Sequence, residues 1–143
     1  MDASTIKELL KKARTIAVIG ANDNPGRPVD RVGRYLIKAG YTVFPVHPVR
    51  KSVWSLPCFS DLASIGQTAD IINVFRAREH CPHHASEAAT LTPHPGLFWM
   101  QLGIESPEAA EILVAAGIPF VQNACLMVEH MHFFHNKSIT TNI

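Results

Sequence analysis

Five short apolar runs, rich in β-branched and aromatic residues, alternate with helical patterns along the chain, and this alternation restricts the fold. The runs cover residues 15–19, 41–46, 71–75, 97–100 and 119–121. A continuous apolar run of this length is typical of a strand that is buried on both faces. Strands that alternate with helices predict a parallel sheet covered by helices on both sides. We therefore expect a three-layer α/β/α domain with about five parallel strands in the order 3-2-1-4-5.

Helix signals lie before, between and after these runs. Thr5 and Glu8 resemble a capping box, and an apolar face follows. Pro28 suits the first turn of a second helix, in which Gly33 predicts close packing on the sheet. Ser106 is a suitable N-cap for a later helix. The remaining patterns predict a short helix over 60–65 and an alanine-rich helix over 82–92, whereas 47–60 is expected to be irregular.

Length and composition narrow the class of protein. With 143 residues, the chain has about the size of one domain, so we expect a single domain over 1–143 with a frayed tail over 136–143. A formal net charge of +1 argues against a nucleic-acid binder, and no apolar stretch is long enough for a membrane span. The three cysteines are widely spaced and odd in number, which favours a reducing compartment and a cytoplasmic location.

The expected topology places the functional site. In open parallel sheets, ligands bind beyond the carboxyl ends of the strands, where the strand order reverses. The candidate loops are therefore 20–27, 47–51, 76–79, 101–104 and 122–125.

The first of these loops suits a phosphate. Gly20 ends a strand, and a helix begins near Pro28 with Arg27 and Arg31 on its first turns. A helix start presents free N–H groups and a partial positive charge. Asn22 occupies the position of the second glycine in the dinucleotide-binding pattern G-x-G-x-x-G, so the loop departs from that pattern.

The end of the second strand distinguishes between cofactors. NAD-binding domains commonly carry a carboxylate there, which binds the ribose 2′-hydroxyl. This chain has His47, Pro48, Arg50 and Lys51 and no carboxylate. A basic pair suits a ribose with an extra phosphate, as in NADP or coenzyme A (CoA), or it is simply a solvated surface pair.

Two histidine clusters are candidates for metal binding, and one cysteine is a candidate reactive thiol. His80, Cys81, His83 and His84 lack the spacing of known zinc motifs, and adjacent helical residues point about 100° apart, so we expect no metal site there. We expect none at the later cluster, His130, His132 and His135. Cys125 lies near the expected ligand mouth, where a thiol is either reactive or an inert small side chain. No catalytic residue can be assigned.

Four motifs together resemble those of the small single-domain CoA-binding proteins. They are N-P-x-R-P after the first strand, V-F-R after the third, W-M-Q-L-G after the fourth and a late N-x-C. These proteins are similar to the CoA-binding domain of the succinyl-CoA synthetase α subunit. The resemblance covers about residues 14–132. It implies a Rossmann-like domain that holds CoA across the strand ends.

The resemblance also implies roles for individual positions. The pyrophosphate would meet Gly20, Ala21, Asn22, Arg27 and Pro28, with Arg31 as a further charge partner. The adenosine and its 3′-phosphate would lie near His47, Pro48, Arg50 and Lys51, and the adenine near Val74, Phe75 and Arg76. The pantetheine arm would pass Gln101, Leu102 and Gly103, with Asn123 and Cys125 close by. Members of the family commonly carry Asn-Pro where this chain has His47-Pro48, and Arg where it has Ala124.

The sequence thus predicts non-catalytic binding of CoA or an acyl-CoA. One alternative is a small NADP-dependent oxidoreductase or its accessory. Another is a regulatory protein whose nucleotide site is degenerate. The sequence leaves open whether the chain forms a homodimer or binds another protein.

Overall fold

A computed structural model describes residues 1–135 and contains a five-stranded parallel sheet. The strand order is β2-β1-β5-β6-β7. The segments predicted as strands all form strands, because each is a short, mostly apolar run. Their bounds are β1 (Thr15–Ile19), β2 (Thr42–Val46), β5 (Ile71–Val74), β6 (Leu97–Met100) and β7 (Phe120–Val121).

A single bridge extends the sheet beyond β2. Phe59 pairs in parallel with Val46, and its backbone exchanges hydrogen bonds of 2.9 Å with Pro45 and His47. Counted as the third strand, this bridge gives the expected order 3-2-1-4-5, with β5 and β6 as fourth and fifth and β7 beyond them. The run 71–75, third along the sequence, therefore pairs with β1 and not with the outer edge of β2.

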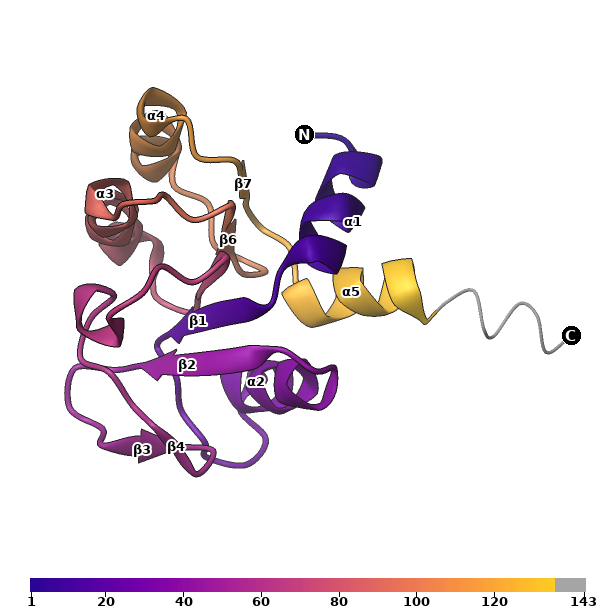
Figure 1. Cartoon of the computed structure of the whole chain (residues 1–143), viewed down its shortest axis with the longest axis vertical. Coiled ribbons are helices and arrows are strands. Elements are labelled where there is room, and N and C mark those ends of the chain that lie inside the picture. Colours follow the sequence, from indigo (N-terminus) through magenta and orange to yellow (C-terminus); the bar gives the residue numbers. More distant parts are fainter. Residues whose placement is uncertain (136–143) are drawn as a thin grey trace, which may run out of the picture.

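Helices cover both faces of the sheet (Figure 1), which confirms the three-layer α/β/α, Rossmann-like prediction. One face packs against α1, α2 and α5, and the other against α3 and α4. No helix within residues 1–135 combines the length and apolar character that crossing a bilayer requires. The helix bounds are α1 (Ala3–Lys12), α2 (Pro28–Lys38), α3 (Cys81–Thr90), α4 (Pro107–Ala116) and α5 (Leu126–Phe134).

The ends of the helices follow local chemistry, with one correction. Ser106 caps α4 as predicted, since its side chain accepts from the Ala109 N–H at 3.1 Å. Helix α1 starts earlier than the Thr5–Glu8 pattern indicated. Its N-cap is Asp2, whose carboxylate accepts from the Thr5 N–H at 2.9 Å. Asp2 prevails because it is itself a strong N-cap residue three positions before Thr5.

The connections contain small elements that periodicity could not reveal. The segment expected to be irregular, 47–60, forms a two-stranded antiparallel sheet from β3 (Ser52–Val53) and β4 (Leu56–Pro57). The short helix expected over 60–65 is the 3₁₀ turn η1 (Ala63–Ile65), and a second such turn, η2 (Arg78–His80), precedes α3. The tail expected over 136–143 lies outside the described residues.

Candidate functional site

Gly20 marks the point where the strand order reverses. It follows β1 directly, and β1 lies between β2 and β5. The residue has a positive φ of 85°, and a Cβ there would lie 2.3 Å from the carbonyl oxygen of Phe75. The first loop therefore crosses the end of β5 at a distance that only glycine permits.

A cavity of about 610 Å³ opens beside this crossing, between the start of α2, the end of β5 and the start of α5. We call it the α2–α5 cavity. Eight of the predicted site residues line it, and their convergence follows from the parallel topology. They are Arg27, Pro28, Arg31, Phe75, Arg76, Gln101, Leu102 and Cys125.

Three of these eight are arginines without a charge partner among the described residues. Arg27 and Arg31 are exposed and Arg76 is half-buried. Within residues 1–135, no carboxylate lies at ion-pair distance from Arg27, Arg31 or Arg76. Arg27 is also the N-cap position of α2, and no side chain caps that helix. Uncompensated positive charge and a helix N-terminus therefore face one cavity, an arrangement that favours an anion.

A second cavity, of about 330 Å³, lies on the α3 side of Gly20 and Arg76. We call it the α3 cavity. Among the predicted site residues, Gly20, Pro48 and Arg76 line it. Arg76 therefore borders both cavities.

Several predicted site residues line neither cavity and support the loops instead. Ala21 and Val74 are fully buried in the core. The Asn22 side chain accepts from the Asn24 N–H at 2.8 Å. The Asn123 side chain accepts from the Gly103 N–H at 2.8 Å, which joins the loop after β6 to the loop after β7.

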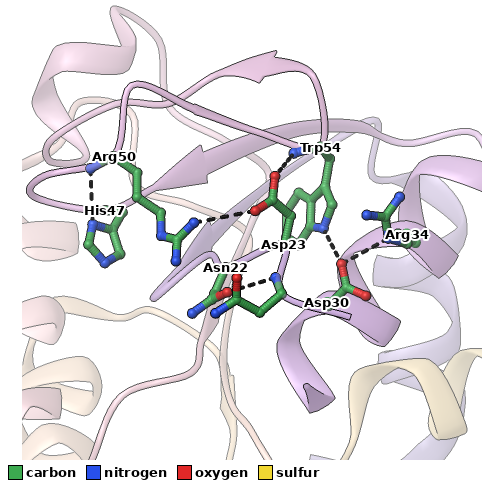
Figure 2. A network of polar contacts seen from close by, with 8 residues as sticks. Asn22, Asp23, Asp30, Arg34, His47, Arg50 and Trp54 are labelled. Carbon is green, nitrogen blue, oxygen red and sulfur yellow. Dashed lines mark hydrogen bonds and ion pairs between the residues drawn. The ribbon is translucent and has the colours of Figure 1, made fainter. Parts of the chain in front are cut away.

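Arg50, the first residue of the basic pair after β2, makes a contact that sequence reasoning missed (Figure 2). Arg50 forms an ion pair of 3.3 Å with Asp23 of the first loop, whereas Lys51 is exposed. The Asp23 carboxylate also accepts from the backbone N–H of Trp54 at 3.1 Å. The first loop and the β3–β4 segment are thus held together at the rim of the site.

Trp54 corrects the expectation for Gly33. Its indole N–H donates to Asp30 at 3.0 Å, and Asp30 also pairs with Arg34 at 2.8 Å (Figure 2). A Cβ at Gly33 would lie 2.1 Å from the indole ring. Gly33 therefore permits close packing on Trp54 and not on the sheet. The residues between strands carried no periodic signal that would have placed an indole on α2.

Gln101 supports the start of α5. It is buried, and its side-chain oxygen accepts from the Leu126 N–H at 3.3 Å and from the Asn73 amide at 3.2 Å. Asn73 was not among the predicted residues, although an asparagine in an otherwise apolar strand was a visible signal. Its own Oδ1 is buried and has no hydrogen-bond partner among the described residues.

His47 holds the turn that carries the basic pair. Its Nδ1 accepts from the backbone N–H groups of Val49 at 3.1 Å and Arg50 at 3.2 Å. An asparagine side chain can accept from the same two N–H groups. The histidine thus replaces the asparagine that the family resemblance led us to expect at this position. Burial, with the positive charges of Arg50 and Arg76, lowers the pKa of His47 from its ordinary value of 6.5.

The variant His47→Asn is expected to reduce the loss of stability in mild acid. Because the pKa of His47 is lower in the folded chain, the unfolded chain binds more protons as the pH falls below about 6.5. Stability from this group is complete above that pH and is lost as the pH falls through the folded pKa. Urea unfolding between pH 7.5 and 5.5 measures the difference. Parallel pH profiles for the variant and the natural chain would contradict this role.

The geometry defines a Rossmann-like α/β domain with a cavity at its topological switch point. Comparison with known proteins assigns the family: residues 14–131 match the CoA binding domain, and the chain belongs to that family. It is 34% identical to the uncharacterized protein YneT of Bacillus subtilis, over 87% of this chain and 91% of that protein.

Solved structures share the fold. A Thermus thermophilus protein, described as cell-free ID.343, is 39% identical and has a TM-score of 0.88, over 94% of this chain and all of its own. An acetyl-coenzyme A synthetase of Candidatus Korarchaeum cryptofilum is 16% identical with a TM-score of 0.71, over 81% of this chain and 27% of the synthetase. At that identity the synthetase shows a common fold alone.

Proposed function

We propose that the chain binds CoA or an acyl-CoA and does not itself catalyse a reaction. The observation that carries the proposal is the α2–α5 cavity, where three arginines that have no charge partner within residues 1–135 share a wall with apolar side chains. CoA has the matching character, because its phosphates are strongly anionic and its pantetheine arm is long and weakly charged. Membership of the CoA binding domain family supports the same ligand.

The proposed orientation follows the charges. The pyrophosphate lies at the start of α2, where Arg27 and Arg31 and the uncapped helix N-terminus face the cavity. The 3′-phosphate lies toward Lys51, since Arg50 is engaged by Asp23 and the Lys51 ammonium is exposed. The arm follows the apolar wall formed by Leu102, Val128 and their neighbours.

The absence of proton-transfer groups supports a binding role. Among the described residues that line the α2–α5 cavity there is no histidine, aspartate or glutamate. Cys125 is the one thiol there, and it has no histidine beside it in that lining. General acid–base or nucleophilic catalysis on a bound thioester requires such a group within hydrogen-bond reach.

Calorimetric titration of the reduced protein with CoA, dephospho-CoA, NADP and NAD tests the proposal. We expect CoA to bind more tightly than dephospho-CoA, and NADP and NAD not to bind. NADP binding in preference to CoA would instead support the oxidoreductase alternative. If none of the four ligands binds, the proposal is contradicted and a degenerate site is supported.

The variant Arg31→Gln is expected to weaken CoA about tenfold, because one hydrogen bond between charged groups is lost in a partly solvated position. Arg31 is exposed and has no ion-pair partner within residues 1–135, so the substitution leaves the packing intact. Arg14→Gln is the matched control, because Arg14 precedes β1 and lies at the opposite end of the strands from the cavity. Equal affinities for the two variants would place the phosphates elsewhere.

A further inference from the structure

The α3 cavity contains a cluster that the proposed function does not use: His83, His84 and Glu87. Glu87 follows His84 by three residues and His83 by four, so helix geometry places its carboxylate between the two imidazoles. The two histidines alone point in diverging directions, and Glu87 was not among the predicted site residues. The pattern H-H-x-x-E was the available signal.

His84 is an unusual group in this cluster. Its side chain is 9% exposed, and its Nδ1 lies 2.9 Å from a carboxylate oxygen of Glu87. Its Nε2 is buried and has no hydrogen-bond partner among the described residues. Buried polar atoms almost always have a partner, so this nitrogen is an unexplained group in a residue that lines the cavity. His84 Nδ1 and the Glu87 oxygen lie close enough to bind one ion together, in place of the proton that they share.

Two hydrogen bonds hold the Glu87 carboxylate in place. One oxygen lies 2.9 Å from His84 Nδ1, and the Leu62 N–H donates to the second carboxylate oxygen at 2.9 Å. The cavity therefore offers a carboxylate in a fixed position beside two imidazoles.

The cluster is compact enough for one ion. One potential ligand atom of each residue lies within 4.8 Å of the others. Ligand atoms around a tetrahedral zinc ion, at about 2.0–2.1 Å from the metal, are roughly 3.3 Å apart. The exposed His83 ring can close this difference by a small rotation.

We propose that His83, His84 and Glu87 form a binding site for a divalent transition-metal ion of the zinc class in the α3 cavity. Imidazole nitrogen with a single carboxylate is a donor set that suits zinc and not magnesium or calcium, which prefer oxygen alone. Three protein groups leave a coordination position that opens into the cavity. Zinc binding needs no CoA, so this site stands or fails independently of the proposed function.

Titration of chelator-treated, tag-free protein with Zn²⁺ tests this site, and Co²⁺ absorption reports the coordination. We expect one saturable Zn²⁺ per chain. His83→Gln, His84→Gln and Glu87→Gln should each weaken it by about tenfold or more. His94→Gln is the matched control, because His94 is exposed and lies outside the cluster. Urea unfolding of metal-free variants separates lost ligands from lost folding, and the exposed His83 gives a variant that leaves the core untouched.

The outcomes are decisive in either direction. Weakened binding in the three cluster variants, with His94→Gln unchanged, supports the site. Zn²⁺ binding that is the same in His83→Gln, Glu87→Gln and the natural chain would show that other surface histidines bind the ion, and would overturn the proposal. The absence of saturable Zn²⁺ binding would show that the cluster does not hold a metal ion, and would overturn the proposal as well.

Discussion

Replacing Gly20 by alanine is expected to lower the free energy of unfolding by about 3 kcal/mol, the sum of backbone strain and overpacking. Gly20 has a φ of 85°, which residues other than glycine adopt only at an energetic cost. The Cβ of an alanine there would lie 2.3 Å from the Phe75 carbonyl oxygen. That oxygen belongs to the backbone at the end of β5 and cannot rotate away. The loop must therefore lift off the sheet, and CoA binding should weaken with it.

Gly26→Ala provides the matched control for this prediction. Gly26 lies in the same loop with a φ of 86°, but no described atom lies within 4 Å of the Cβ position. It should lose only the conformational part, about 1 kcal/mol. Urea denaturation of both variants measures the difference. Equal losses at the two positions would show that the contact with Phe75 is unimportant.

The effect of Gly33→Ala on the free energy of unfolding should change sign when Trp54 is removed. In the natural chain, we expect a loss of about 1–2 kcal/mol, because the new Cβ would collide with the indole of Trp54 at 2.1 Å. The Trp54 side chain cannot move away easily. Its indole N–H donates to Asp30, and the Trp54 backbone N–H donates to Asp23. In a Trp54→Ala background the collision is gone. Alanine is a better helix former than glycine, so the same substitution should then stabilise the chain by about 1 kcal/mol.

This double-mutant cycle isolates the contact between helix α2 and the β3–β4 segment. The comparison needs the single variants Gly33→Ala and Trp54→Ala and the double variant, each followed by urea unfolding. A loss of similar size in both backgrounds would mean that Gly33 acts through the helix backbone alone.

The five strands of the sheet were predictable because each is a short, mostly apolar run next to helical patterns. The run 97–100 forms β6 with the predicted bounds, and Ser106 caps the following helix as its side chain suggests. The position of the third strand was not predictable. A single bridge at Phe59 leaves no periodicity in the sequence, so the run 71–75 was counted third although it lies beside β1.

The candidate site was predictable where topology alone brings residues together. Arg27, Arg31 and Arg76 converge because parallel strands end at one edge of the sheet. The partners of those residues were not predictable, since they depend on single long-range contacts. Asp23 meets Trp54 across 31 positions of sequence, and no local pattern encodes such a pair.

Arg76 places one positive charge beside two cavities. It lines both the α2–α5 cavity and the α3 cavity. An anion that binds it from one side neutralises a positive charge that would otherwise repel a cation on the other side. If an anion and a cation occupied the two proposed sites, each would increase the affinity for the other by the same factor, as linkage requires. Arg76 would thus couple the two proposed sites through its charge.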